Sequence, residues 1–370
     1  MILTSLIITI IYLFLIGKFI IGFNKVSIFK LTNTPAKTQF SILIPFRNEA
    51  ENLPALLESI NALNYPNQFF EIIFIDDNSE DNSAEIVQKT SAEFKLILNN
   101  RQTKSPKKDA ITSAIKKAKY EWIITTDADC IIPKYWLDSF NEYIQKNDVV
   151  SIAAPVAYIE EQSFLDQFQI LDILSLQGAT IGGFGINKPF LCNGANFAYK
   201  KSIFKKLNGF KGNTNVASGD DIFLLEKIAK AYPKQLHYLK CQHAIIKTKS
   251  QPYWNALFSQ RVRWSAKTSQ YNNWFGKVTG LVVLLINLLI ITNLILTCFG
   301  VINIKILFYI LVIKFSIDFF LVYKSASFFN QKHILKSYAL GFIVYPFFSV
   351  YIAIASLFLG YKWKDRYFKK

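Results

Sequence analysis

The sequence predicts an α/β domain with a parallel sheet, flanked by membrane-spanning helices at both ends of the chain. Three observations lead to this fold class. Short β-prone runs alternate with helical runs through the middle of the chain, two of these β-prone runs end in paired acids, and long apolar stretches occupy both ends. At 370 residues, 51% of them hydrophobic, the chain is long enough for one large domain or two ordinary ones.

The N-terminal stretch, residues 2–23, is apolar except for small hydroxyl side chains, Tyr12 and Lys18. At about 1.5 Å per residue, it is long enough to cross a bilayer as a helix. A basic start and a small-residue cleavage site, which mark a cleaved signal peptide, are both missing. We therefore expect an uncleaved anchor over residues 1–24.

The middle of the chain alternates between strand and helix. The predicted strands are Phe40–Pro45, Glu71–Ile75, Phe94–Leu98 and Trp122–Thr126, and the predicted helices are Asn48–Leu63, Ser83–Thr90 and Lys108–Ala118. Strict alternation favours a parallel sheet covered on both faces, with right-handed connections that bring successive strand ends to one edge.

Acidic side chains follow two of these strands, at Asp76-Asp77 and at Asp127-Ala128-Asp129. If both loops meet at one edge, they form an acidic cleft where ligands of α/β sheets bind. Nearby cations, Arg47, Lys107 and Lys108, would suit the phosphates of a nucleoside diphosphate. The alternatives are a turn at Asp76-Asp77 and a solvated helix start at the lysines.

Two carboxylates one residue apart repel each other unless a cation joins them. Asp127 and Asp129 are therefore candidate metal ligands, and hard oxygen donors favour Mg²⁺ or Mn²⁺ carrying a substrate's phosphates. The alternative for this tripeptide is a solvated turn.

The formal net charge of +16 suggests nucleic-acid binding at first sight. However, the basic residues are scattered or lie beside the apolar stretches, as at Lys247, Lys249, Arg261, Arg263 and Lys267. Such flanks face the cytoplasm by the positive-inside rule. We interpret the charge as membrane topology plus binding of an anionic substrate, and expect no nucleic-acid partner.

The four cysteines are far apart without a C-x-x-C pair, and the three histidines lack zinc-like spacing. The sequence also lacks G-x-S-x-G and the phosphate-binding G-x-x-x-x-G-K-[ST] motif. This disfavours a disulfide framework, zinc chemistry, serine hydrolysis and P-loop ATPase activity.

Three further candidate spans lie at residues 277–299, 303–323 and 338–360. With a cytoplasmic middle region, three spans would place the basic tail outside, against the positive-inside rule. Either the segment around Pro346 folds back without crossing, or the tail breaks the rule. The tail carries Lys362, Lys364, Arg366, Lys369 and Lys370.

Five motifs in order give the chain a wider resemblance. They are Phe40-Ser-Ile-Leu-Ile-Pro45 with Asn48-Glu49, Ile75-Asp-Asp-Asn-Ser79 with Asp81, Thr126-Asp-Ala-Asp129, Ser218-Gly-Asp-Asp221, and Gln260-Arg-Val-Arg263-Trp264. In this order they resemble the membrane-bound branch of the family 2 glycosyltransferases, which includes cellulose, hyaluronan and poly-N-acetylglucosamine synthases and ceramide glucosyltransferases. The resemblance covers roughly residues 40–265.

The resemblance implies a GT-A fold, Rossmann-like in its nucleotide-sugar binding, a nucleotide-sugar donor, Mg²⁺ or Mn²⁺, and inversion at the anomeric carbon. It assigns the metal to Asp129 with Asp127, and the general base to Asp221, with Asp220 as the alternative because the usual middle glutamate is an aspartate here. The expected donor-binding residues are Pro45, Glu49, Asp76, Asp77, Lys108, Asp127, Gln260, Arg263 and Trp264.

The acceptor is expected to meet Asn193, Gly194 and Trp264, whose flat ring suits a sugar. Each assignment has a structural alternative. Cys192-Asn-Gly is also an ordinary turn, Gly219-Asp220-Asp221 also caps a helix, and Gln260–Trp264 also reads as an interfacial helix on a basic membrane surface. The apolar stretch Phe164–Gly185 could be a second interfacial helix.

The predicted organisation is an anchor (1–24), a GT-A domain (38–250), an interfacial helix (251–275), a region of about three spans (276–362) and a basic tail (363–370). The expected protein sits in a bacterial inner membrane with a cytoplasmic catalytic domain. It would transfer sugar to a lipid, lipid-linked or polysaccharide acceptor, with partner proteins for export as a further expectation. The alternatives are a processive polysaccharide synthase subunit and a catalytically silent export scaffold.

Overall fold

The computed structural model describes residues 2–90, 94–159, 163–216, 218–267, 270, 272–358, 360–363 and 366–368. The chain divides into two compact units. The sheet unit comprises Ser27–Ile159 and Leu191–Lys249, and the helical unit comprises Met1–Val26, Glu160–Phe190 and Ser250–Lys370. Of the predicted basic tail, Lys364, Lys369 and Lys370 lie outside the described residues.

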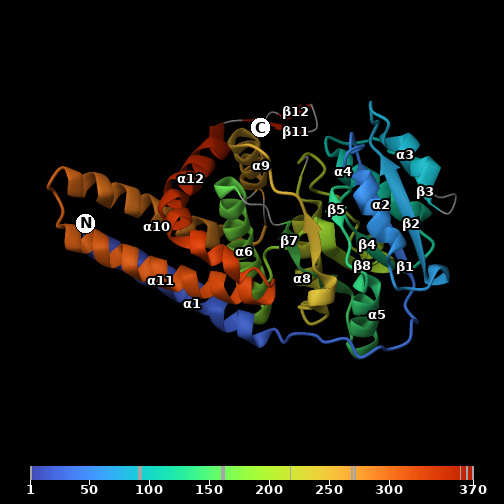
Figure 1. Cartoon of the computed structure of the whole chain (residues 1–370), viewed down its shortest axis with the longest axis horizontal. Coiled ribbons are helices and arrows are strands. Elements are labelled where there is room, and N and C mark those ends of the chain that lie inside the picture. Colours follow the sequence, from blue (N-terminus) through green and yellow to red (C-terminus); the bar gives the residue numbers. More distant parts are fainter. Residues whose placement is uncertain are drawn as a thin grey trace. The chain divides into compact units, whose positions relative to one another are not determined.

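The sheet unit is built on a seven-stranded sheet of order β3-β2-β1-β4-β8-β6-β9 (Figure 1). Its strands are β1 (Phe40–Phe46), β2 (Phe70–Asp76), β3 (Lys95–Leu98), β4 (Trp122–Thr125), β6 (Ser151–Ala153), β8 (Phe197–Lys200) and β9 (Leu236–Tyr238). The four predicted strands are present and pair in parallel. β8 runs antiparallel to both of its neighbours, so the sheet is mixed rather than purely parallel.

The helices of the sheet unit are α2 (Leu53–Asn61), α3 (Ser83–Thr90), α4 (Pro106–Lys117), α5 (Trp136–Lys146), α7 (Lys201–Lys206) and α8 (Asp220–Ala231). They include the three that the alternating pattern predicted, α2 to α4, and three that it did not, α5, α7 and α8. α2 starts five residues later than predicted, because Asn48 adopts a positive φ of 51° that a right-handed helix excludes. α4 starts at Pro106, whose fixed φ suits a first helical turn.

Burial of the central strands on both faces explains their apolar composition. Six of the seven residues of β1 are buried, including Phe40, Ile42 and Ile44, which pack in one core with residues of β2, β4 and α5. A second, three-stranded sheet joins β5 (Cys130–Ile131), β10 (Ile246–Thr248) and β7 (Val156–Tyr158). β5 thus begins one residue after Asp129.

The helical unit contains α1 (Ile2–Lys25), α6 (Phe164–Gly185), α9 (Trp254–Ala266), α10 (Trp274–Cys298), α11 (Ile304–Phe328) and α12 (Tyr338–Phe358), followed by the hairpin strands β11 (Tyr361–Trp363) and β12 (Arg366–Phe368). α1 and α6 cross closely at glycines. A Cβ on Gly22 would lie 2.1 Å from the carbonyl oxygen of Gly182, so no larger residue fits there.

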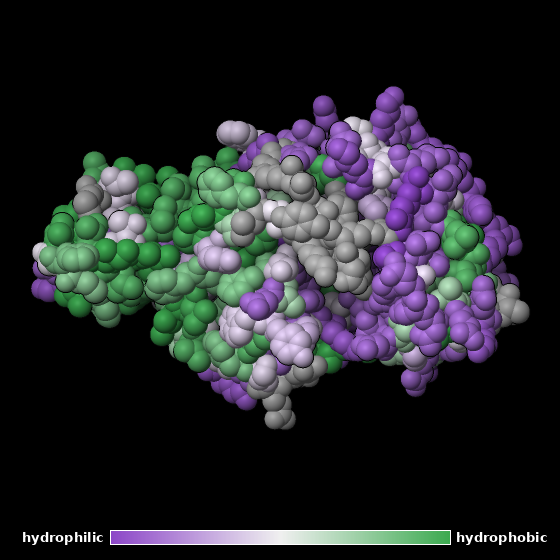
Figure 2. All heavy atoms as spheres, turned by 90° about the horizontal axis from the view of Figure 1, so that it is seen from above, coloured by the Kyte–Doolittle hydropathy of each residue, from purple (hydrophilic) through white to green (hydrophobic). Residues whose placement is uncertain are grey.

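In the described part of the chain, four helices are long and apolar enough to cross a membrane, as predicted. They are Ile2–Lys25, Trp274–Cys298, Ile304–Phe328 and Lys332–Phe358. Figure 2 shows the surface of the long helices as mainly hydrophobic, whereas the surface of the sheet unit is mainly hydrophilic. α12 continues through Pro346 without interruption, so the suggested fold-back at this residue is not what the structure shows.

Candidate active site

The loops that follow β1 and β2 are bound to each other. The Asp77 amide donates to the Phe46 carbonyl (2.8 Å), and the Asn48 and Glu49 amides donate to the hydroxyls of Ser79 (3.1 Å) and Ser83 (2.8 Å). The structure therefore joins the loop after β1 to the first of the two predicted acidic loops, at the carboxyl edge of the sheet. Pro45 is a half-buried residue of β1, and Glu49 is buried, with its carboxylate accepting from the Asn52 side chain at 2.7 Å.

Asp76 and Asp77 are both buried but have different partners. Asp76 Oδ1 accepts from the amide (2.8 Å) and the hydroxyl (2.7 Å) of Ser79. These bonds are typical of a turn, which was the structural alternative to a ligand-binding role for Asp76. Asp77 Oδ1 instead accepts from Asn99 Nδ2 (2.7 Å) and Arg101 Nε (2.6 Å). An ionic partner fixes the Asp77 carboxylate more firmly than a neutral hydrogen bond would.

Arg101 and Asn99 were not predicted. Both follow β3, just as Asp77 follows β2, so the rule that strand ends meet at one edge would have found them. The loop that carries Arg101 is held by Asp109 of α4, whose carboxylate accepts from the amides of Gln102 (2.9 Å) and Thr103 (2.8 Å).

The Asp127-Ala128-Asp129 segment follows β4 and is half open to solvent at both acids. Asp127 Oδ1 lies 2.6 Å from Lys107 Nζ, and Asp129 Oδ1 lies 3.7 Å from the Cys130 thiol. Burial raises the pKa of Cys130 well above its usual value, and the negative charges of Asp129 and Asp127 raise it further. The two carboxylates therefore create a negative field at this point of the chain.

Lys107 of α4 links the two acidic motifs. Its Nζ lies 2.6 Å from Asp127 and 3.6 Å from Asp220 Oδ2. Burial by itself lowers the pKa of Lys107, but the charges of Asp127, Asp220 and Asp221 outweigh it and raise the pKa above the ordinary value. Lys107 is therefore a permanent cation between acids that lie 93 residues apart in the chain.

Lys108, the residue expected to bind donor, points elsewhere. It is 1% exposed, and its Nζ donates to the carbonyls of Asn213 (2.7 Å) and Val216 (2.8 Å) and lies 4.7 Å from the Phe223 ring. In the structure, Lys108 thus supports the segment that leads into α8, and its neighbour Lys107 meets the acids.

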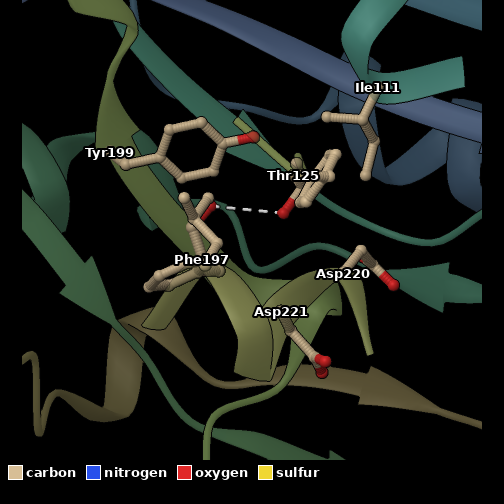
Figure 3. Close-up of a pocket in the computed structure, with 8 residues that line it drawn as sticks. Ile111, Thr125, Phe197, Tyr199, Asp220 and Asp221 are labelled. Carbon is tan, nitrogen blue, oxygen red and sulfur yellow. Dashed lines mark hydrogen bonds between the residues drawn. The ribbon is translucent and has the colours of Figure 1, made fainter. Parts of the chain in front are cut away.

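Asp220 and Asp221 open α8 after Gly219, whose φ of 84° strongly favours glycine. Asp221 is half exposed, and its carboxylate accepts from the amides of Gly194 (3.1 Å) and Ile222 (2.8 Å). Asp220 is buried. Figure 3 shows both acids at the start of α8, where they line a small pocket with Ile111, Thr125, Phe197, Tyr199, Phe210 and Leu224.

The Asn193–Asn196 turn lies against these acids. A Cβ on Gly194 would be 3.1 Å from Asp220 Oδ2 and 3.5 Å from Lys107 Nζ. Asn193 Oδ1 accepts from the Ala195 amide (3.0 Å), as an ordinary turn would require, while the Gly194 carbonyl accepts from the Thr125 hydroxyl (2.7 Å). Gly194 is therefore the predicted acceptor residue that the structure places beside the acids of α8.

Gln260, Arg263 and Trp264 lie on α9 of the helical unit, and all three are half-buried. Gln260 Oε1 accepts from Arg261, whose guanidinium carbon lies 4.2 Å from the centre of the Trp264 ring. Arg261 occupies one of the two variable positions of the Gln-x-x-Arg-Trp motif, and it contacts the Gln and the Trp of that motif.

In the part of the chain that the structure describes, no three His, Cys, Asp or Glu side chains form a group that could hold a metal ion alone. Asp127 and Asp129 nevertheless fit Mg²⁺ or Mn²⁺, because such ions commonly take one or two carboxylates and complete their shell with substrate phosphates and water.

Residues 41–208 match the family described as Glycosyl transferase family 2. These residues form a family 2 glycosyltransferase domain. They include β1 to β8 of the described sheet unit, together with α6 of the helical unit, and therefore carry Lys107, Asp127 and Gly194.

Relatives of this glycosyltransferase domain are found among polysaccharide synthases. The poly-beta-1,6-N-acetyl-D-glucosamine synthase of Staphylococcus epidermidis is 28% identical over 240 residues, which cover 61% of this chain and 53% of the relative. The synthase of the same description from Staphylococcus aureus strain COL is 29% identical over 144 residues, covering 37% and 33%. The chain thus spans about half, or less, of the length of these relatives.

A solved structure resembles the whole chain. The mannosyltransferase PcManGT from Pyrobaculum calidifontis, determined in complex with GDP-Man and Mn²⁺, has a TM-score of 0.54 at 14% identity and covers 96% of both chains. Together with the family match, this likeness confirms the predicted GT-A fold with its apolar helices.

Proposed function

We propose that the protein is an inverting glycosyltransferase that moves a hexose-type sugar from a nucleotide-diphosphate donor to a lipid, lipid-linked or polysaccharide acceptor. The observation that carries the proposal is the Lys107 bridge, which brings the Asp127 motif and the Asp220-Asp221 motif to one place. Sugar transfer needs two acidic sites with separate tasks, one at the leaving diphosphate and one at the attacking hydroxyl.

Asp221 is proposed as the general base. Its carboxylate is half exposed and can meet an acceptor hydroxyl, whereas Asp220 is buried and faces Lys107. The Gly194 amide orients Asp221 and leaves it able to take a proton as the nucleotide departs. The backbone of Asn193 and Gly194 would then form the floor of the acceptor site.

The donor would occupy the edge formed by the loops after β1, β2 and β4. Asp77, held by Arg101, is proposed to bind the nucleotide base, with Asp76, Glu49 and Pro45 shaping that side. Asp129 and Asp127 would hold Mg²⁺ or Mn²⁺, which neutralises charge on a leaving diphosphate when bound. Lys107 adds a fixed cation beside them, and Gln260, Arg263 and Trp264 are proposed to contact the diphosphate and the acceptor sugar.

The proposed setting is a bacterial inner membrane, with the glycosyltransferase domain in the cytoplasm. Its supports are the four apolar helices and the basic residues that flank them. A nucleotide-sugar donor is made in the cytoplasm, which agrees with this orientation.

Donor-dependent release of nucleotide tests the function. Purified protein in detergent with Mn²⁺ or Mg²⁺ is offered UDP- and GDP-sugars together with bacterial lipid extract or oligosaccharides. UDP-N-acetylglucosamine comes first, because relatives over half the chain are poly-N-acetylglucosamine synthases. We expect nucleotide release that stops when the metal ion is chelated, together with a labelled product in mass spectrometry. The absence of release with every donor and acceptor would overturn the proposal.

The length of the product separates the two enzymatic alternatives. A single added sugar indicates transfer to a lipid or lipid-linked acceptor, and a ladder of sugars indicates a processive synthase, the activity named for the staphylococcal relatives. Unchanged product in cells that carry Asp221→Asn would instead support the silent scaffold.

A further inference from the structure

α6 carries three polar side chains, spaced three residues apart, that form hydrogen bonds with the segment before α9 and with α9 itself. Asp166 Oδ1 accepts from the Ser250 hydroxyl (2.6 Å), and Gln169 exchanges two hydrogen bonds with the main chain of Gln251 (2.8 and 2.9 Å). Asp172 Oδ2 accepts from Arg261 Nε (2.8 Å). Residues at this spacing lie near one another on a helix, so α6 presents one polar row to this segment.

The third contact differs from the other two in charge and burial. The side chains of Arg261 and Asp172 are each only 6% exposed, and the pair joins residues 89 positions apart in the chain. Arg261 also donates to Gln260 and lies over the Trp264 ring at 4.2 Å. One guanidinium therefore contacts α6 and two side chains of the Gln-x-x-Arg-Trp motif together.

The apolar packing around α9 cannot set this orientation by itself. Leu257 and Val262 pack with Phe168 of α6 and with Phe348, Ile352 and Ala355 of α12. Contacts of this kind are non-directional, whereas an arginine–carboxylate bond has a defined geometry. A buried charge pair also adds little net stability over apolar packing, so a task in orientation is the better account of it.

We propose that Asp172 and Arg261 are positioning residues that hold Gln260 and Trp264 in the orientation used for sugar transfer. The proposal rests on the proposed function for the roles of Gln260 and Trp264. The orientation itself is a property of the helical unit and can be measured without any substrate.

The first test compares Asp172→Asn with Asp166→Asn, which removes a carboxylate from the same polar row but leaves Arg261 untouched. The Trp264 signal is obtained by subtracting the fluorescence of the matching Trp264→Phe variant, because the chain has six tryptophans. We expect Asp172→Asn to change the acrylamide quenching of Trp264 and Asp166→Asn to leave it unchanged. Unchanged Trp264 quenching in Asp172→Asn overturns the proposal.

Nucleotide release gives the second readout. A misplaced contact group costs rate, so we expect kcat to fall about 10-fold or more in Asp172→Asn, with Asp166→Asn close to the parent. Combining Asp172→Leu with Arg261→Met removes both charges and should preserve folding, judged by circular dichroism and thermal unfolding. If the pair has a positioning role, the folded double variant keeps a low kcat. If its kcat equals that of the parent, the pair is only structural.

The two proposals fail in different ways. If the parent releases no nucleotide with any donor, the proposed function fails, and the Trp264 quenching still decides the role of the pair. If the parent is active and the Trp264 signal of Asp172→Asn and of the double variant matches the parent, only the positioning role fails.

Discussion

Two lysine–carboxylate clusters in this protein have similar ion-pair distances but different surroundings. Lys107 of the sheet unit lies 2.6 Å from Asp127 and 3.6 Å from Asp220, with side chains 18%, 34% and 9% exposed. Lys314 of α11 lies 2.6 Å from Asp318, and the two side chains are 2% and 17% exposed. Tyr12 of α1 donates to the other oxygen of Asp318 (2.6 Å), and three aromatic rings lie within 5.0 to 5.6 Å of Lys314 Nζ.

The difference lies in the balance of charge and in access. The Lys107 cluster has more acids than cations and is partly open, so a cation and an anionic diphosphate can still join it. The Lys314 cluster pairs one lysine with one aspartate, and the lysine is buried among apolar helices, where an unpaired charge is costly. We therefore interpret the first as a site of chemistry and the second as a tie between α1 and α11.

Loss of the base should produce the largest effect. Asp221→Asn keeps the shape and, through its one oxygen, can keep the bond from the Gly194 amide, but it loses the bond from the Ile222 amide and the proton acceptor, and we expect transfer to fall about 10³-fold. Nucleotide release with saturating donor measures this. Glu85→Gln, on the exposed surface of α3, is the matched control and should remain at the parent rate. A rate for Asp221→Asn within 10-fold of the parent rate would show that Asp221 is not the general base.

Breaking the Lys314 cluster should lower the stability of the protein and leave its activity largely unchanged. Lys314→Met leaves the Asp318 carboxylate, which is 17% exposed, without its lysine partner, and we expect a loss of about 3 kcal/mol in the free energy of unfolding. Adding Asp318→Leu removes the second charge and should recover most of this loss. Thermal unfolding in detergent compares the variants, and equal losses in the single and double variants would contradict the pairing.

Removing the positive charge of the Lys107 cluster should have an intermediate effect on the rate of transfer. Lys107→Gln removes the cation between Asp127 and Asp220, and we expect about a 10²-fold loss of kcat/KM for the donor. Lys104→Gln, an exposed lysine of the preceding loop, serves as the control. If Lys107→Gln unfolds at the parent temperature and keeps the parent rate, the cluster is not a site of chemistry.

The smallest effect concerns Glu142, a buried carboxylate of α5 outside both clusters. Its burial raises the pKa, but hydrogen bonds from Lys146, Thr32 and Thr34 outweigh this and lower the pKa from 4.5 to about 2. A depressed folded-state pKa adds stability above pH 4.5, and this contribution is lost as the pH falls from 4.5 to about 2.

Acid titration of unfolding measures this contribution, which we expect to be about 1.5 to 3 kcal/mol, the range for hydrogen bonds to a charged group. Glu142→Gln should remove that part of the pH dependence and leave the pH 2 stability nearly unchanged. An identical pH dependence in the variant would show that other carboxylates carry it.

Much of the fold could be predicted because its signals are local. The strand Phe40–Phe46 and the helix Ser83–Thr90 follow from runs of apolar and polar residues within a few positions. The antiparallel strand β8 was not predicted, because a strand of four residues far from its partner β4 has no periodicity that reveals its direction. The acids of the candidate site were also predicted, since paired carboxylates at a strand end are unusual.

Their partners could not be predicted. The sequence offers 42 lysines and arginines and 26 acids, and the choice among them depends on folding. Adjacent Lys107 and Lys108 illustrate this, since one faces Asp127 and the other faces main-chain carbonyls. The pairing of Arg261 with Asp172 likewise depends on packing.

By itself, the sequence determined the class of fold, the four apolar helices, the acids and their order along the chain, because hydrophobic periodicity and residue chemistry act over short distances. Only the tertiary structure decided which cation meets which acid, which of two neighbouring lysines points into the site, and which acid at the start of α8 remains open. These choices depend on burial and on the direction of side chains, which arise when segments distant in the sequence pack together.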